Sequence, residues 1–382
     1  MARPEVQMVD LKTEYQQIKE EVDQAVLACL ESTAFIKGPD VVSFEAEFAE
    51  YLGVKHVISC ANGTDALQLA LMALELKPGD EVIVPAFTYV ATAEVVSLLG
   101  LTPVMVDVDP DTFNVERVHV ERAITQATKA IVPVHLFGQC VDMDPLLEVA
   151  KEHGIPVIED TAQAIGADYT GADGVPRKAG TIGTIGCTSF FPTKNLGCYG
   201  DGGAIMTNDD ELAHRLRMIS NHGQERKYYH DIVGVNSRLD TLQAAILRIK
   251  LRRLKEYVAA RQRAAAHYDK VLADCPGIQA PARHPRSSHS FHQYTLKVER
   301  ERRDAMQAYL QEKGVPTNVY YPLPLHHQKA FADLRGTQPL TVSEQLSEEV
   351  VSLPMHTQLT QEQLEHVTSN VAEYCTRELG RV

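Results

Sequence analysis

The seven cysteines of this sequence include no C-x-x-C pair and no spacing typical of zinc ligands. They are odd in number and spread from Cys29 to Cys375, which indicates reduced thiols in a cytosolic compartment and not a disulfide framework. We therefore expect neither disulfides nor a bound metal.

Long apolar segments are also lacking. The N-terminal residues contain no apolar core of a signal peptide, and the most apolar long run, Val90 to Val106, is interrupted by Glu94, Gly100 and Pro103. We therefore expect a cytoplasmic protein that does not span a membrane.

Positive charge is scarce relative to negative charge, with 37 lysines and arginines against 51 aspartates and glutamates, a net charge of −14 over 382 residues. This balance argues against general binding to nucleic acid or to anionic membranes, although it permits a local basic pocket for a phosphorylated ligand. One segment, Arg248 to Arg263, carries seven basic residues. A nucleic-acid-binding helix is one interpretation of this segment, and a solvated helix face is the interpretation we favour.

The chain is long enough for two domains, and from Val57 onward it alternates between short apolar strands, turns and helices. The expected strands are 57–59, 81–85, 103–107, 130–134 and 156–160, after helices at 14–30 and 41–52. Because these strands are continuous apolar runs, they indicate a mainly parallel sheet covered by helices on both faces. The fold class is α/β.

The pattern changes after about Asn221. Heptad-like spacing predicts one long helix over 238–267, followed by a smaller α+β segment. That segment offers a strand at 294–298 and helices at 303–312, 343–352 and 361–375. We therefore expect a large α/β domain over 1–237, a bridging helix over 238–275 and a small C-terminal α+β domain over 276–382.

Lys194 lies in an apolar, glycine-flanked segment close to Phe190 and Phe191. Burial lowers the pKa of an amine, and a neutral amine can attack a carbonyl to form a Schiff base. A surface lysine is the ordinary alternative, so the interpretation depends on the rest of the chain.

Two further segments suggest an anion site and a carboxylate at strand ends. Asn62, Gly63 and Thr64 follow a strand and open a helix, where free backbone amides and the threonine hydroxyl suit an anion. Asp160 ends another strand, where ligands of open α/β sheets bind, and its carboxylate suits a protonated ring nitrogen. Simple capping of a helix or strand end is the alternative for both segments.

Three other residues complete a possible cofactor site. Tyr89 follows a strand end and can stack on a ring or pack in the core, Gln163 can bond to a ring substituent or to backbone, and Ser189 can bind a phosphate. An anion cradle, a ring-nitrogen carboxylate, a stacking aromatic and a desolvated lysine are together what pyridoxal phosphate requires.

Five motifs resemble the DegT/StrS-type sugar-nucleotide aminotransferases over nearly the whole chain. They are Gly-Thr-Asp-Ala at 63–66, Glu-Asp-Thr-Ala-Gln at 159–163, Ser-Phe-Phe-Pro-Thr-Lys at 189–194, Gly-Asp-Gly-Gly-Ala at 200–204 and Gly-Val-Asn-Ser-Arg-Leu-Asp at 234–240. The resemblance implies the fold type I aminotransferase architecture, pyridoxal 5′-phosphate as cofactor and a homodimer with active sites at the subunit interface.

The resemblance also implies a role for each matching residue. Lys194 would form the Schiff base with the cofactor, Asp160 would hold the pyridine nitrogen, Gln163 would contact the ring hydroxyl and Tyr89 would stack on the ring. The phosphate would be bound by Gly63, Thr64 and Ser189, and by Asn236 of the other subunit. Arg238 would reach across the interface to the anionic part of the substrate, with a solvated helix-start charge as its alternative.

Related dehydratases carry histidine in place of the lysine, so Lys194 favours transamination with glutamate as amino donor. Within the family, the resemblance is strongest to enzymes that aminate UDP-2-acetamido-3-keto-glucuronate for surface polysaccharide. It rests on residues 187–208 and on the loop with Tyr320, Tyr321 and His326. Those enzymes have histidine where this chain has Tyr320. His326 and His327 lack partners for a metal in the sequence, which favours substrate contact or a structural role. Another keto sugar as substrate, and a non-catalytic cofactor-binding regulator, stay open as alternatives.

Overall fold

The computed structural model describes residues 4–334 and 339–379. Its first part is built on a twisted sheet whose strands lie in the order β3-β2-β4-β5-β8-β9-β1, with isolated parallel bridges joining β4 to β5. Within the described residues β9 runs antiparallel to both its neighbours, while the other pairings are parallel. The strands are β1 (His56–Cys60), β2 (Glu81–Pro85), β3 (Thr102–Val106), β4 (Thr128–Ile131), β5 (Ile158–Asp160), β8 (Ile185–Ser189) and β9 (Gly203–Thr207).

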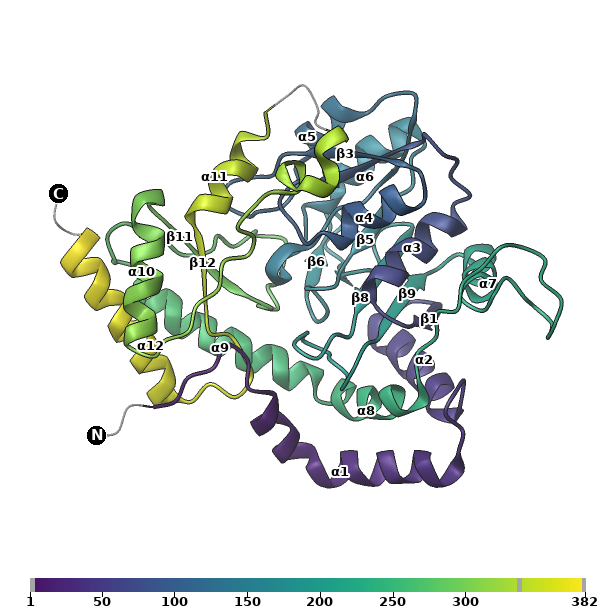
Figure 1. The fold of residues 1–382 in the computed structure, drawn as a ribbon, viewed down its shortest axis with the longest axis horizontal. Helices are drawn as coiled ribbons and strands as arrows, with labels where there is room; N and C mark the ends of the chain where they lie inside the picture. Colours follow the sequence, from purple (N-terminus) through teal and green to yellow (C-terminus); the bar gives the residue numbers. More distant parts are fainter. Residues whose placement is uncertain (1–3, 335–338, 380–382) are drawn as a thin grey trace.

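Helices cover both faces of this sheet (Figure 1). Successive residues of β2 face opposite layers: Val82 and Val84 pack with α3, α4 and α7, whereas Ile83 packs with the layer of α5 and α6. The two-sided burial that the apolar runs predicted is confirmed. The helices are α1 (Leu11–Ser32), α2 (Pro39–Leu52), α3 (Gly63–Ala73), α4 (Ala91–Leu98), α5 (Arg117–Ala123), α6 (Met143–His153) and α7 (Asp210–Ile219).

The C-terminal part has its own apolar core, which Val6 from the N-terminal segment joins. A three-stranded antiparallel sheet, ordered β10-β11-β12, packs there with α9, α10 and α12. The elements of this part are α8 (Thr241–Leu251), α9 (Leu254–Leu272), β10 (Ile278–Gln279), β11 (Tyr294–Val298), α10 (Arg300–Glu312), α11 (Thr341–Glu349), β12 (Val350–Leu353) and α12 (Gln361–Tyr374). Short pieces are the hairpin β6 (Asp168–Thr170) with β7 (Pro176–Lys178), and the turns η1 (Leu136–Gly138), η2 (Leu325–His327), η3 (Lys329–Leu334) and η4 (Cys375–Leu379).

The prediction of one helix over 238–267 is wrong. The chain turns at Arg252 and Arg253, where the Arg253 amide donates to the Lys250 carbonyl and divides α8 from α9. The two helices share one core and then diverge: α8 packs with α1 and α2, and Leu254 and Val258 at the start of α9 join it there. The rest of α9, from Ala264 on, packs in the C-terminal part. Similar spacing on both sides of the turn therefore does not indicate one continuous element.

The predicted helix at 343–352 also ends early. It stops at Glu349, and Val350 begins β12, which pairs with β11 from Tyr294↔Leu353 onward. Two β-branched valines at this point favour an extended strand, because their side chains fit a half-buried sheet better than a helix.

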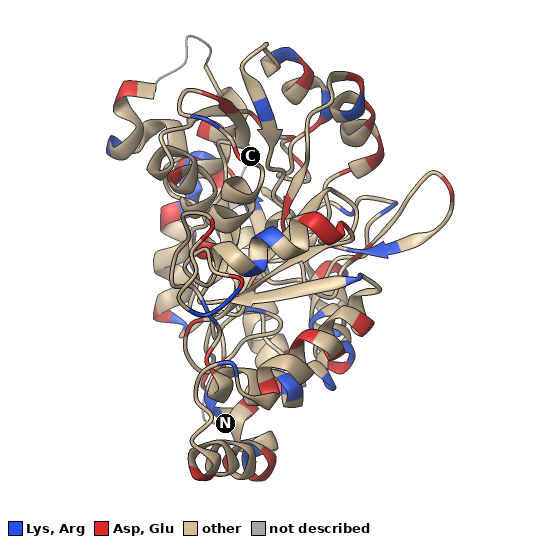
Figure 2. Ribbon diagram, turned by 90° about the vertical axis from the view of Figure 1, so that its right-hand side faces the viewer, with Lys and Arg blue, Asp and Glu red and all other residues tan. Residues whose placement is uncertain are grey.

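The basic segment 248–263 does not form a free cationic face. Arg248 pairs with Asp40 and Glu47, Lys250 with Glu14, and both Arg252 and Arg253 with Glu21. On the side drawn in Figure 2, acidic and basic residues are interspersed. Four of the seven positive charges of the segment therefore hold α1 and α2 against α8 and the turn that follows it, and the buried Arg261 donates to backbone carbonyls of the C-terminal part.

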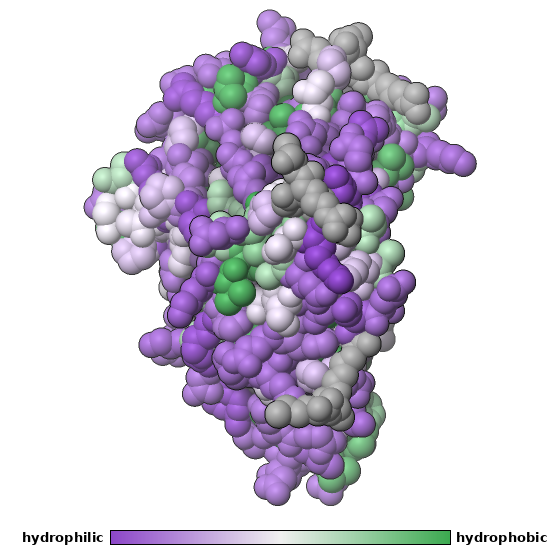
Figure 3. All heavy atoms as spheres, turned by 90° about the vertical axis from the view of Figure 1, so that its left-hand side faces the viewer, coloured by the Kyte–Doolittle hydropathy of each residue, from purple (hydrophilic) through white to green (hydrophobic). Residues whose placement is uncertain are grey.

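Figure 3 views the molecule from the side of the C-terminal part. This face is mostly hydrophilic, with hydrophobic residues in small separate groups. No helix among the described residues is both long and apolar enough to cross a membrane.

Candidate active site

A cavity of about 770 Å³, here the main cavity, lies at the carboxyl edge of the large sheet. Because parallel strands end at one edge, the segments after β1, β2, β5 and β8 all meet there. Nine of the twelve predicted site residues line it: Gly63, Thr64, Tyr89, Asp160, Gln163, Ser189, Lys194, Tyr320 and Tyr321.

Lys194 and Asp160 form the electrostatic centre of this cavity. Burial lowers the pKa of Lys194 to about 8, against a smaller opposing effect of the nearby Asp160 carboxylate. Burial raises the pKa of Asp160, opposed by hydrogen bonds from the Ala162 amide (3.1 Å) and the Thr92 hydroxyl (3.0 Å) and by the charge of Lys194. The amine is therefore easily deprotonated, and the carboxylate gains from a cation placed beside it.

Another part of the cavity wall is formed where the start of α3 closely approaches the end of β8. Asn62 caps α3 by accepting from the Asp65 amide at 2.8 Å, so the first amides of the helix stay available to a ligand. A Cβ on Gly63 would lie 2.6 Å from the Ser189 Cβ, so glycine alone permits this approach. The amides, Thr64 and Ser189 thus form a cradle that suits an anion such as a phosphate.

Gln163 is held in one orientation on the cavity wall. Its carbonyl oxygen accepts from the Phe137 amide at 2.8 Å, and its amide nitrogen donates to the Tyr321 hydroxyl at 2.9 Å. Tyr89 lies 6.4 Å from Tyr321, centroid to centroid, and is 58% exposed, so its ring is free for a further contact.

Three lining or supporting residues were missed from the sequence. Thr92 holds Asp160, and the buried Thr88 hydroxyl and His292 Nδ1 have no hydrogen-bond partner among the described residues. Burial, with the charges of Lys194 and Arg261, lowers the pKa of His292 well below its usual value. A sequence signal for Thr88 and Thr92 exists, because they are four residues apart just after β2. No local signal points to His292, which comes from the distant C-terminal part.

Asn236 and Arg238 lie outside the main cavity. They line a second cavity of about 500 Å³ with Gly200 and Asp201, and Asp201 also lines the main cavity. His326 lines neither of them; its ring is bonded to Glu344 at 3.1 Å. The structure therefore does not place His326 at the predicted substrate site.

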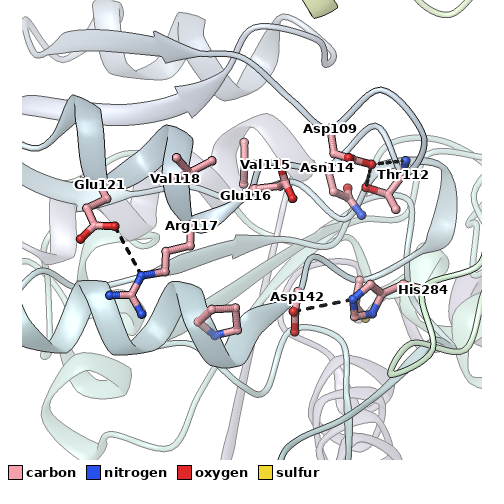
Figure 4. Close-up of a pocket in the computed structure, with 12 residues that line it drawn as sticks. Asp109, Thr112, Asn114, Val115, Glu116, Arg117, Val118, Glu121, Asp142 and His284 are labelled. Atoms are coloured by element: carbon pink, nitrogen blue, oxygen red, sulfur yellow. Dashed lines mark hydrogen bonds and ion pairs between the residues drawn. The ribbon is translucent and has the colours of Figure 1, made fainter.

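The third cavity, of about 470 Å³, lies beside α5 and α6 (Figure 4). Most of its charged side chains have partners: Asp109 accepts from Thr112, Arg117 pairs with Glu121, and Asp142 faces His284 at 3.7 Å. Glu116 also lines this cavity, but the lining residues include no lysine that could act with a carboxylate as Lys194 and Asp160 do in the main cavity.

The residues of the main cavity fit pyridoxal phosphate. The glycine-dependent cradle suits its phosphate, the buried Asp160 suits a protonated ring nitrogen, and Lys194 suits its aldehyde. The fold and this donor set define a pyridoxal-phosphate-dependent aminotransferase of fold type I.

Comparison with known proteins gives the family. The model of the DegT/DnrJ/EryC1/StrS aminotransferase family matches residues 16–372, and the chain belongs to this family. Family members use pyridoxal phosphate, and solved neighbours hold it in its pyridoxal and pyridoxamine forms.

Two curated relatives and one solved structure are especially similar. The chain is 50% identical to UDP-2-acetamido-2-deoxy-3-oxo-D-glucuronate aminotransferase of Pseudomonas aeruginosa, over 92% of this chain and 95% of that one. It is 45% identical to UDP-N-acetyl-3-dehydro-alpha-D-glucosamine 3-aminotransferase of Acidithiobacillus ferrooxidans, over 95% and 96%. The crystal structure of DesV from S. venezuelae with a ketimine intermediate superposes with a TM-score of 0.94, at 42% identity over 98% and 99%.

Proposed function

We propose that this aminotransferase moves the amino group of glutamate to the keto group of a nucleotide sugar, UDP-2-acetamido-2-deoxy-3-keto-glucuronate, in the synthesis of a surface polysaccharide. The pair formed by the partly buried Lys194 and the buried Asp160 carries the transamination part of the proposal. The sugar follows the relative with 50% identity.

Lys194 is the proposed acid–base group. When bound, the cofactor supplies an electron-poor ring that stabilises negative charge on the reacting carbon. Lys194 Nζ takes the proton from the α-carbon of the amino donor and later gives a proton to the sugar carbon that receives the amine. Its pKa near 8 places it close to working pH, where it both accepts and donates.

Asp160 is proposed to keep the cofactor ring nitrogen protonated. Its oxygens are oriented by Thr92 and by the Ala162 amide, and neither donor neutralises the carboxylate. A cation beside Asp160 relieves the cost of burying its charge, so the carboxylate and the ring proton stabilise each other.

Arg238 is proposed to bind the anionic part of the substrate. Among the described residues it forms no hydrogen bond or ion pair, and its charge lowers the pKa of Lys37 after the larger effect of burial. Asp201 and Asp240 line the same cavity but form no ion pair with Arg238, so its guanidinium stays available to a carboxylate or a diphosphate, both of which a UDP-glucuronate offers.

We also propose a homodimer in which Asn236 and Arg238 complete the site of the other subunit. The segment after α7 projects from the body in Figure 1 and carries exposed apolar residues, with Val233 86% and Tyr228 78% exposed. An apolar projection next to a second cavity is typical of an interface. Sedimentation of the holoenzyme as a monomer at micromolar concentration would contradict this proposal.

The experiment compares two UDP-3-keto sugars that differ only at C6, a carboxylate in one and a hydroxymethyl group in the other. Each is generated in situ with glutamate as donor, and the amino sugar is measured by mass spectrometry. We expect kcat/KM to favour the carboxylate at least about tenfold, since a paired guanidinium–carboxylate contact stabilises by about 1.4 kcal/mol or more.

Arg238→Gln is the matched variant, because glutamine keeps much of the length of the side chain and removes its charge. It should lower kcat/KM for the carboxylate sugar. Preference for the hydroxymethyl sugar would point to the substrate of the second relative. If neither UDP sugar is turned over but a dTDP or GDP keto sugar is, the proposed nucleotide is wrong. If no keto sugar is turned over, a non-catalytic regulator is favoured.

A further inference from the structure

His326, His327 and Glu344 form a cluster outside the three cavities described above. The Nε2 atoms of His326 and His327 lie 3.1 and 3.5 Å from the same oxygen, Oε1 of Glu344. One ligand atom from each residue lies within 4.8 Å of the other two. The sequence offered no third ligand for the two histidines, and α11 supplies it.

The cluster is closed on one side and open on the other. The His326 side chain is 13% exposed, while those of His327 and Glu344 are 44% and 37% exposed. The imidazole centroids are 4.2 Å apart and the rings are tilted by 53°, so they do not stack face to face. This arrangement holds three donors together at a place where two of the three side chains are partly exposed to solvent.

The backbone on both sides of the cluster is anchored to the large sheet. Next to the histidines, the Leu325 amide donates to the Ala86 carbonyl, just after β2, at 2.9 Å. Next to Glu344, the Val342 and Ser343 amides donate to the Asp107 carboxylate, just after β3, at 2.9 and 2.7 Å.

The two anchors are themselves neighbours. Strands β2 and β3 pair in parallel up to Pro85↔Val106, and the Ala86 amide donates to the Val106 carbonyl at 2.8 Å. The backbone that carries the histidines and the backbone that carries the glutamate are therefore anchored to adjacent strands. This anchoring reduces the conformational entropy lost when a ligand binds.

We propose that His326, His327 and Glu344 bind a first-row divalent cation such as Zn²⁺. Two imidazole nitrogens and one carboxylate oxygen are a donor set that zinc accepts, with water in the remaining position. The ion joins the loop that carries Tyr320 and Tyr321 in the cavity wall to α11. This site needs no part of the proposed sugar specificity, and its own test is independent of transamination.

The test is equilibrium dialysis of untagged holoenzyme against Zn²⁺ alone, in a buffer without chelators, followed by metal analysis. We expect one Zn²⁺ per chain that is lost, or bound at least about tenfold more weakly, in His327→Gln and in Glu344→Gln. Both residues are partly exposed, so these variants should fold even if His326→Gln does not. All seven cysteines remain in each variant, so zinc held by thiols would persist.

Glu349→Gln on the same helix and the exposed His153→Gln are matched controls that should bind Zn²⁺ as the wild type does. Saturating Zn²⁺ should also raise the melting temperature of the wild type and of the controls, and not that of the His327→Gln/Glu344→Gln double variant. Equal zinc stoichiometry and affinity in the wild type and the double variant, or no binding by the wild type, would overturn the proposal.

Discussion

The chemistry proposed for this enzyme depends on two charged groups that modify each other, the partly buried Lys194 and the buried Asp160. The pKa of Lys194 is lowered to about 8 because desolvation opposes its positive charge. The pKa of Asp160 is raised because the hydrogen bonds from Thr92 and the Ala162 amide compensate only part of its desolvation. Neither environment stabilises the fold, since burying a charge costs free energy. Their joint placement at the strand ends is therefore best explained by a ligand that both groups contact.

Asp160→Asn tests the role of the carboxylate. The amide keeps the volume of the side chain and its carbonyl oxygen can still accept from the Ala162 amide, so the fold should persist. Without a negative charge beside the ring nitrogen, kcat should fall at least about 100-fold, the lower range of acid–base effects. Steady-state kinetics, with cofactor content measured on the same samples, provide the check.

Asp274→Asn is the control, because Asp274 is exposed and lies in the C-terminal part. It should leave kcat unchanged. A wild-type kcat in Asp160→Asn with cofactor bound would contradict the assignment of this residue.

The sequence predicted these two residues because each lies in a local pattern, a strand end or an apolar glycine-flanked segment. It did not predict Thr92 or His292. Thr92 acts through a hydrogen bond across the sheet edge, and His292 is brought to the cavity by the C-terminal part. Contacts of that kind depend on packing between distant segments, which local patterns do not encode.

At the scale of elements, the cradle depends on how closely the start of α3 approaches the end of β8. A Cβ at residue 63 would meet the Ser189 Cβ at 2.6 Å and the Ser189 Cα at 3.1 Å. Gly63→Ala should therefore push the two elements apart, at a cost of about 1–3 kcal/mol in the free energy of unfolding. The dissociation constant of the cofactor should rise at least about tenfold, because the amides and Ser189 no longer converge on the phosphate.

Gly154→Ala separates these two effects. Residue 154 ends α6 at a φ of +65°, and a Cβ added there would meet open space, so alanine costs backbone strain of about 1 kcal/mol and makes no close contact. It should lower stability without changing cofactor affinity, measured by fluorescence titration of the apoenzyme. Unchanged cofactor affinity in Gly63→Ala would contradict the cradle.

Helices and strands were predicted well where the apolar pattern of a segment matches a single element that packs on one core. The strand at 294–298 and the helix that starts at Gln361 lie where the apolar spacing placed them. The long helix was mispredicted because the apolar spacing continues across the turn at Arg252 and Arg253, since Leu254 and Val258 of α9 pack in the same core as α8. The strand β12 was missed because its pairing with β11 is a long-range contact.

At the scale of the whole molecule, the strand order places four strand ends from distant parts of the sequence around one cavity. The α/β class and the parallel sheet followed from the apolar runs, but the antiparallel β9 and its place between β8 and β1 did not. Asn236 and Arg238 line a second cavity instead of the main one, and the proposed dimer would bring them to the main cavity of the other subunit. The domain limits at 237 and 275 stay predictions.

The decisive measurement for the proposed chemistry is the visible spectrum of the purified holoenzyme before and after glutamate is added, with no sugar present. We expect a yellow protein whose visible band bleaches with glutamate, because Lys194 would hold the cofactor before the donor is added and would then move the proton from the donor's α-carbon. Lys194→Ala, tested alongside, should not complete this change at the wild-type rate. A wild-type band that is indifferent to glutamate would contradict glutamate as donor, and a protein that takes up no pyridoxal phosphate would contradict the proposed chemistry as a whole.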